Sequence, residues 1–321
     1  MLPDLMVTAG YLKGVRMKPA GTAANVGNAV MLGVVLMLFG DLLFAVNDAV
    51  GKWLVASFAL GQVLVMRSLG SFIVLVPMIA RQGPRALLDV RQPGLLFGRA
   101  VMATADVSLF YAAVAYLPLA DVITFYMAAP IYVAALSHFL LGERIGWRRW
   151  LAVGVGFAGV VIALRPSTAM FSLPSLFAVA GSVGFALTII LSRYLRSTSD
   201  TALVTSQTLV VMVVGIILSV SDWREAGLDI WIAMLFLGVV GTCAHLLLTR
   251  ALKLAPASLL APLQYTLLLW AVVFGFVFFG DIPDAQLLAG AAIIVFAGLF
   301  IFHRKNVKGE DAQQAIPLDG R

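Results

Sequence analysis

The chain has 321 residues, of which 61% are hydrophobic and 12% are charged, and its mean hydropathy is +1.00. A soluble globular protein carries charge on about a quarter of its residues. The composition therefore excludes a soluble protein and indicates an integral membrane protein. The net charge of +6 does not indicate a nucleic-acid-binding protein, because the basic residues are distributed between loops and are not gathered in one patch.

Apolar stretches long enough to cross a bilayer recur along the whole chain. A transmembrane helix needs about 17–25 predominantly apolar residues. We expect ten such helices, at residues 29–52, 59–80, 94–116, 119–141, 147–164, 171–193, 202–220, 229–251, 256–279 and 285–303. The sequence thus predicts an all-α membrane protein.

The two ends of the chain are polar. Residues 1–28 lack the apolar core of a signal peptide, so we interpret them as an N-terminal extension in which Met17 is a second candidate for the natural start. Residues 304–321 form a polar C-terminal tail.

The Lys and Arg residues predict the orientation of the chain. Cytoplasmic loops collect basic residues, and most of the 22 Lys and Arg fall on the cytoplasmic side when the N-terminus is placed there. Lys52, Arg165 and Arg224 fall on the opposite side. We therefore expect a multi-pass protein of the bacterial inner membrane with both termini in the cytoplasm.

The two halves of the chain are related by an inverted repeat. Residues 113–142 align without a gap with residues 251–280 at an offset of 138, and Pro118 matches Pro256. Basic residues follow the first segment but precede the second, so the two segments have opposite orientations in the membrane. Inverted repeats are chiefly a transporter architecture.

We accordingly divide the membrane part into two inverted five-helix repeats, residues 29–164 and 165–303. No segment outside the bilayer is long enough for an ATPase or a soluble catalytic domain. Transport would therefore depend on a gradient.

Ionisable residues inside apolar spans mark a candidate binding site. An arginine in mid-span costs about 2.5–3.5 kcal/mol on insertion scales, so Arg67 should face protein or water. It would either pair with Asp48 or Asp106 or hold a substrate carboxylate or gate ion. Asp106 would be a structural acid or a protonatable, substrate-contacting group. Asp48 would form a helix-surface pair with Lys52, four residues later.

The remaining polar residues suggest neither a metal nor a cofactor. His138 and His245 stand singly, and neither has a Cys or acid spaced to complete a metal site. They would be packing residues or proton relays. Arg99 lies nearer a helix end and is expected to extend towards the cytoplasm.

Aromatic residues and prolines complete the set of candidates. We expect the substrate cavity to involve Phe44, Asn47, Arg67, Asp106, Phe110, Tyr126, His245, Gln264, Tyr265 and Trp270. Pro130 and Pro262 lie in the fourth and ninth helices, where a proline frees a carbonyl and allows a bend. They would be gate hinges or structural kinks.

Glycine-rich segments have a structural interpretation. Residues 154–159 match GxGxxG, but they lie in an apolar helix with no preceding strand, which argues against a dinucleotide site. We interpret Gly154, Gly238 and Gly241 as small residues at helix contacts.

Several motifs resemble a known family. Leu117-Pro118-Leu119-Ala120, Pro130, Leu141-Gly142-Glu143-Arg144 and the glycine-rich span that ends at Gly159 resemble the repeat of the drug/metabolite transporter superfamily, EamA type. A similar second copy extends the resemblance over residues 29–303. The resemblance implies ten helices around a central cavity lined by the first, third, fourth, sixth, eighth and ninth. It also implies transport of amino acids, nucleotide-related metabolites, riboflavin, S-adenosylmethionine or drugs.

We therefore expect a secondary transporter that works by alternating access as a monomer, with a small-molecule substrate and a coupling ion such as a proton. Export of amino acids, aromatic ones in particular, is the first expectation, because of the aromatic candidates and Arg67 and because the chain resembles the aromatic amino-acid exporters of this superfamily most. Uptake of riboflavin or S-adenosylmethionine is the alternative. An intramembrane enzyme is disfavoured, because neither HExxH nor GxSxG occurs. A channel would favour a continuous polar stripe, whereas the polar groups here are isolated.

Overall fold

The computed structural model describes residues 23–83, 87, 90–117, 119–141, 146–164, 172–220, 222–280 and scattered positions between 285 and 296. All regular elements bounded in these residues are helical, which confirms the predicted all-α fold. They are α1 (Ala23–Val55), α2 (Leu60–Gln82), α4 (Pro93–Val114), α5 (Leu119–Tyr126), α6 (Ala129–Leu141), α7 (Trp147–Leu164), α8 (Leu173–Tyr194), α9 (Asp200–Ser219), α10 (Leu228–Leu254), α11 (Ala257–Leu260), the 3₁₀ helix η3 (Ala261–Tyr265) and α12 (Thr266–Phe279). The last predicted span, 285–303, lies largely outside the described residues.

Length and composition suit these helices to a bilayer. Within the described part of the chain, six helices are long and apolar enough to cross a membrane, namely α1, α2, α4, α8, α9 and α10. Residues Leu263–Phe279 form a shorter apolar helical stretch. The structure thus agrees with a multi-pass membrane protein.

Two of the predicted spans are broken in the middle. The span 119–141 divides into α5 and α6, and the span 256–279 divides into α11, η3 and α12. Pro130 lies in the first turn of α6, and Pro262 lies in the first turn of η3. A proline has no backbone N–H to donate to the preceding turn. Both prolines therefore lie at a change of helical geometry, and their role as hinges remains a prediction.

The helix ends follow from local sequence. Gly83 and Gly280 follow α2 and α12 with positive φ angles of 80° and 69°, which glycine adopts without a Cβ clash, and Gly280 has the left-handed helical conformation. Ser199 caps α9 because its side chain accepts a hydrogen bond from the backbone N–H of Ala202.

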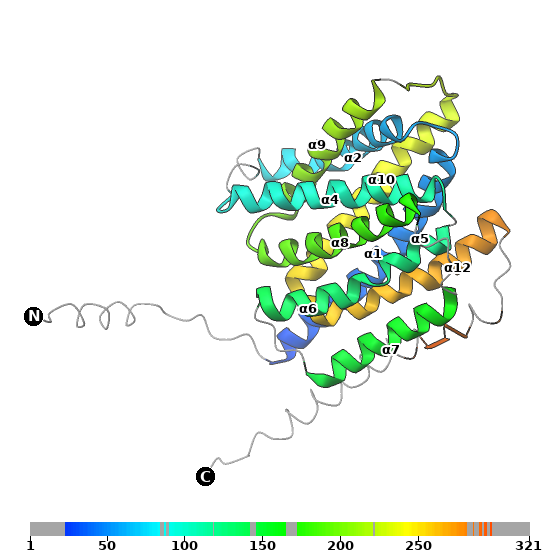
Figure 1. Cartoon of the computed structure of the whole chain (residues 1–321). Coiled ribbons are helices and arrows are strands. Elements are labelled where there is room, and N and C mark those ends of the chain that lie inside the picture. Colours follow the sequence, from blue (N-terminus) through cyan, green and yellow to red (C-terminus); the bar gives the residue numbers. More distant parts are fainter. Residues whose placement is uncertain are drawn as a thin grey trace, which may run out of the picture.

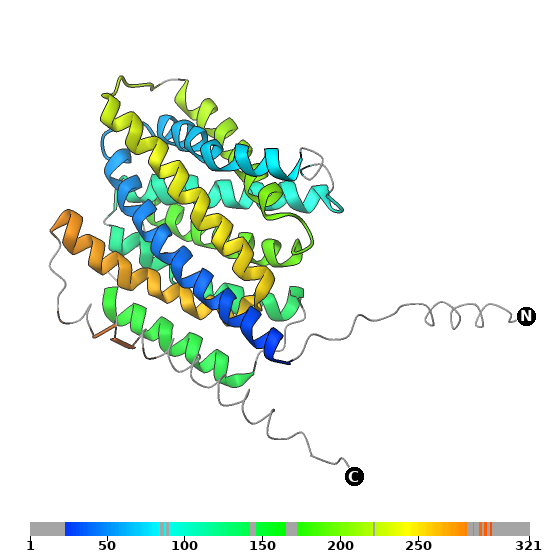
Figure 2. The ribbon, with the colours of Figure 1, turned by 180° about the vertical axis from the view of Figure 1, so that it is seen from behind.

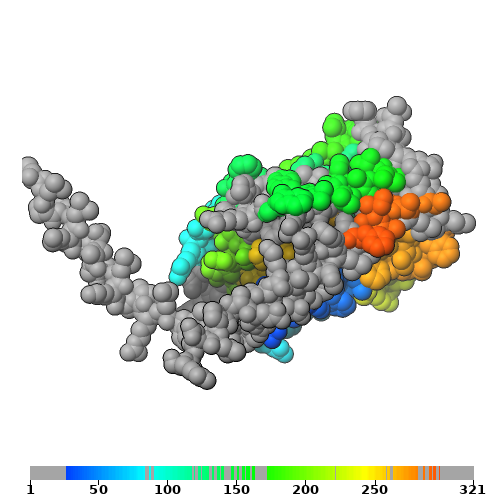
Figure 3. Space-filling view, turned by 90° about the horizontal axis from the view of Figure 1, so that it is seen from below, coloured from blue at the N-terminus to red at the C-terminus, as the bar shows by residue number. Residues whose placement is uncertain are grey.

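Helices of the two halves interleave. α1 packs most extensively on α10, and α4 packs most extensively on α8, so the first helix of each half contacts the third helix of the other. α2 and α9, the second helices of the halves, pack on each other. Figure 1 shows α2 and α9 at one edge of the stack and α7 at the other, and Figure 2 shows α1 and α10 side by side. In Figure 3, α7 in green and α12 in orange are visible on one face.

Glycines allow α2 to approach α10 closely. A Cβ atom built on Gly238 would lie 1.9 Å from the carbonyl oxygen of Arg67, and one built on Gly70 would lie 2.0 Å from that of Leu235. Gly238 therefore acts as a contact residue, as expected. At Gly154 no described atom lies within 4 Å of such a Cβ, so its role as a contact residue stays a prediction.

Candidate functional site

A cavity lies between the two halves. The centres of water molecules could occupy a volume of about 60 Å³ inside it. By that measure one water needs about 10–15 Å³, so this conformation has room for a few waters. The lining residues are Phe44, Asn47, Asp48, Arg67, Asp106, Val107, Phe110, Tyr111, Ile123, Tyr126, Met127, Phe185, His245 and Leu267.

Most of the predicted cavity residues line this cavity. They are Phe44, Asn47, Arg67, Asp106, Phe110, Tyr126 and His245. Three others do not line it: Gln264 and Tyr265 are 1% exposed in η3, and Trp270 stacks on Phe274 in α12. The cavity brings together side chains from α1, α2, α4, α5, α8, α10 and α12.

Sequence reasoning missed Asp48, Tyr111 and Phe185 as cavity residues. Asp48 follows Phe44 by four residues in α1, and Tyr111 follows Val107 by four in α4. Residues four apart lie on the same face of a helix. This spacing could have assigned Asp48 to the cavity face, whereas the sequence interpretation paired it with Lys52. The structure has no ion pair between these two described residues; instead, the Lys52 amine lies 5.2 Å from the centre of the Phe279 ring.

Arg67 is a buried cation without a carboxylate partner among the described residues. Its side chain is 6% exposed, and its Nη1 atom has no hydrogen-bond partner. No carboxylate among the described residues lies within ion-pair distance of it. The guanidinium carbon lies 5.5 Å from the centre of the Tyr111 ring. The expected structural ion pair is therefore absent between the described residues, and the guanidinium remains available to a ligand.

Two tyrosines hold the polar groups of the cavity in place. The Tyr126 hydroxyl donates a hydrogen bond of 2.9 Å to Oδ1 of Asp106. The Tyr111 hydroxyl donates one of 2.8 Å to Oδ1 of Asn47, and Nδ2 of Asn47 donates one of 2.8 Å to the carbonyl of Leu237. These bonds connect α5 to α4, and α4 through α1 to α10. The polar wall is thus fixed by both halves of the chain.

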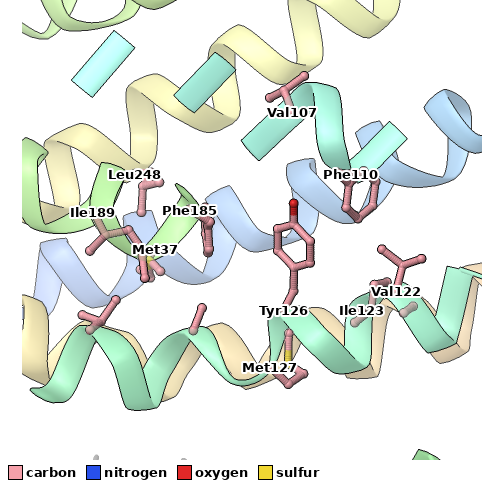
Figure 4. Packing of buried hydrophobic residues seen from close by; sticks show 14 of the residues in the cluster. Met37, Val107, Phe110, Val122, Ile123, Tyr126, Met127, Phe185, Ile189 and Leu248 are labelled. Atoms are coloured by element: carbon pink, nitrogen blue, oxygen red, sulfur yellow. The ribbon is translucent and has the colours of Figure 1, made fainter. Parts of the chain in front are cut away.

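Aromatic rings surround these polar groups. Phe44 contacts Phe185 and His245 edge to face, with ring centres 6.5 Å and 4.9 Å apart. Phe110 contacts Tyr126 edge to face at 5.2 Å. Figure 4 shows the Tyr126 ring standing away from α5, with Phe110 on one side and Phe185 on the other. Such a cage suits a flat, apolar group.

Arg99 does not extend to the surface as expected. Its side chain is fully buried and donates hydrogen bonds to Ser192, to the carbonyl of Leu203 and to Gln207, at 2.6, 2.8 and 3.2 Å. It therefore connects α4 to α8 and α9. These partners hold Nε and Nη1 of the guanidinium, whereas its Nη2 atom has no hydrogen-bond partner among the described residues.

The described residues contain no cluster of His, Cys, Asp or Glu that could hold a metal ion. The side chain of His138 lies outside the described residues. His245 is 4% exposed, and its Nδ1 has no hydrogen-bond partner in the described structure. These observations give no support for a metal centre in that part of the chain.

Comparison with solved structures supports the fold. One solved crystal structure superimposes with a TM-score of 0.69 at 18% identity, and the match covers 85% of this chain and 95% of that one. At this identity the likeness shows the fold alone.

Curated relatives cover nearly the whole chain. A riboflavin transporter of Vibrio cholerae is 29% identical over 84% of this chain and 92% of its own length. An S-adenosylmethionine uptake transporter of Rickettsia bellii is 27% identical over 86% and 94%, and the pseudopaline exporter CntI of Pseudomonas aeruginosa is 29% identical over 85% and 97%.

The EamA-like transporter family model matches this chain twice, at residues 31–165 and at residues 172–303. Together the two matches cover most of the chain and most of the described helices. The chain is therefore a small-molecule transporter of the EamA-like family, with a fold of ten transmembrane helices in two inverted repeats.

Proposed function

We propose that this protein is a secondary transporter of zwitterionic compounds that carry an α-amino-acid group and a flat apolar group, with aromatic amino acids as the first candidates. The observation that carries the proposal is the buried guanidinium of Arg67, which lines the cavity without an ion-pair partner among the described residues. A buried charge without a partner is costly. A substrate carboxylate would remove that cost and form a charge-assisted, bidentate contact.

The other groups of the cavity suit the rest of such a substrate. The carboxylates of Asp48 and Asp106 line the same cavity and are available to an ammonium group. The rings of Phe44, Phe110 and Phe185 offer apolar faces and edges to a flat side chain. The cavity therefore combines opposite charges with an aromatic wall, as an aromatic amino acid requires.

S-adenosylmethionine is a second candidate, supported by the uptake transporters among the relatives. It carries the same amino-acid group, a flat adenine and a positively charged sulfonium. Riboflavin, the substrate named for the Vibrio cholerae relative, carries neither an amino-acid group nor a charge at neutral pH. Its transport would leave the three charged side chains of the cavity without a role.

Transport would follow alternating access in the bacterial inner membrane, with both chain termini in the cytoplasm. The small volume of the cavity, about 60 Å³, implies that the substrate enters a more open state. The breaks at Pro130 and Pro262 offer two positions where one end of a helix could move against the other. Export of amino acids remains the expected direction.

A transport screen with purified protein in liposomes tests the proposal. The panel is labelled phenylalanine, tryptophan, S-adenosylmethionine and riboflavin, without added nucleotide. We expect transport of amino-acid-bearing compounds, and we expect Arg67→Gln to lower it at least tenfold while the protein still purifies as a single species. Arg81→Gln is the matched control, because Arg81 is an exposed arginine on the same helix. Transport of riboflavin alone, or full activity of Arg67→Gln, would refute the proposed substrate class.

A further inference from the structure

The charges that line the cavity do not balance. Arg67 contributes one positive charge, whereas Asp48 and Asp106 contribute two carboxylates. The remaining titratable groups facing the cavity are Tyr111 and Tyr126 from α4 and α5 and His245 from α10. The cavity residues of α8 and α12, Phe185 and Leu267, bring no charge.

The two carboxylates have different surroundings. Asp106 accepts a hydrogen bond from Tyr126 at 2.9 Å, which stabilises a negative charge on it. No described residue donates a hydrogen bond to Asp48, and Lys52 lies against the Phe279 ring. Asp48 lines the same cavity as Asp106 and Arg67. One arginine can balance only one of the two carboxylates, and only Asp106 also has the tyrosine hydrogen bond, so Asp48 is the carboxylate left uncompensated.

An uncompensated carboxylate inside the membrane part of a protein takes up a proton or a cation, because an isolated charge in a medium of low polarity is costly. We propose that Asp48 carries a proton when the cavity is empty and that the ammonium group of the substrate displaces this proton. The inference rests on the proposed function, because it requires a substrate that carries an ammonium group.

The exchange couples substrate movement to proton movement. When the substrate binds, the O–H bond of the Asp48 carboxyl group breaks and the proton leaves to the water on the open side. The ammonium group then balances the carboxylate. When the substrate leaves on the opposite side, the carboxylate takes a proton from the water there. Because the site holds the ammonium group or the proton in turn, substrate and proton cross the membrane in opposite directions.

Calorimetric titration of the full chain in two buffers with different ionisation enthalpies measures the proton directly. L-phenylalanine is the probe, and 3-phenylpropionate, which lacks the ammonium group, is the control ligand. We expect phenylalanine binding to release about one proton and phenylpropionate binding to release none. Asp48→Asn should weaken phenylalanine binding by about ten- to a hundredfold and abolish its proton release. It should change phenylpropionate binding much less.

Asp222→Asn is the matched control variant. Asp222 is 50% exposed outside the cavity, so its replacement should leave proton release unchanged. Phenylalanine binding to the wild-type protein without proton release would overturn this inference and leave the proposed function standing. Proton release that persists in folded Asp48→Asn would also overturn it. Absence of binding by both phenylalanine and S-adenosylmethionine would refute the proposed function itself. The wild-type measurement decides the question even if the variant does not fold.

Discussion

Replacement of Gly238 by alanine should separate α10 from α2 and destabilise the protein. The new Cβ would lie 1.9 Å from the carbonyl oxygen of Arg67 and 2.8 Å from the backbone nitrogen of Ser71. Ordinary contact begins at 3.4 Å, so the two helices must separate by about 1.5 Å, the difference between 3.4 and 1.9 Å. Both clashing atoms belong to the backbone, so no side-chain rotation can relieve them.

The expected loss of stability can be judged from overpacked cores of other proteins. Extra carbon atoms in a packed interior cost about 1–3 kcal/mol. In a chain somewhat smaller than this one, a loss of about 2 kcal/mol in the free energy of unfolding lowers the melting temperature by roughly 5 °C. The displaced atom is the carbonyl of Arg67, so the guanidinium of the same residue should also move. Substrate binding should therefore weaken together with stability.

The assay is thermal unfolding of the purified protein in detergent, followed by tryptophan fluorescence at a fixed scan rate, because unfolding of membrane proteins is often irreversible. Gly154→Ala is the control, since no atom of the described residues lies within 4 Å of its new Cβ. We expect a melting temperature close to that of the wild type for Gly154→Ala and a clear loss for Gly238→Ala. Equal melting temperatures for the two variants would contradict the close crossing of α2 and α10.

Three further predictions concern the cavity, the hinges and the orientation. A Cβ on Gly181 would lie 2.3 Å from the Tyr126 hydroxyl, so Gly181→Ala should displace that hydroxyl. We expect Gly181→Ala and Tyr126→Phe to lower transport alike, and both variants to keep the melting temperature of the wild type. Full transport by both variants would exclude a role for the Tyr126–Asp106 bond. Replacement of Pro130 and Pro262 together by alanine should leave substrate binding intact but slow translocation in liposomes, and wild-type rates would reject the hinges. The orientation can be tested with single cysteines introduced at the exposed positions Glu225 and Gly146 in a Cys243→Ser background. A membrane-impermeant thiol reagent should label position 225 from outside and position 146 only from inside. Labelling of both positions from one side would contradict the predicted topology.

The sequence by itself determined the helical class and the repeat. A bilayer requires long apolar stretches, and basic residues collect on one side of it. The helical class and the repeat can therefore be recognised from the order of apolar and basic residues alone. The sequence also predicted that Arg67 should face protein or water, because a charge in lipid is costly at any rotation of the helix. The structure buries this side chain against the cavity.

Only the tertiary structure decided which faces of the helices meet. Lipid is as apolar as the protein core, so hydropathy does not distinguish a buried face from an exposed one in these spans. This is why Asp48 lines the cavity although Lys52, four residues later, suggested a surface pair, and why Trp270 stacks on Phe274 and does not line the cavity. Arg99 likewise depends on contacts with Ser192 and Gln207, more than ninety residues away, which no local pattern indicates. The cavity exists because α1 packs on α10 and α4 on α8, and such contacts between distant helices follow from packing of small and large side chains rather than from local sequence.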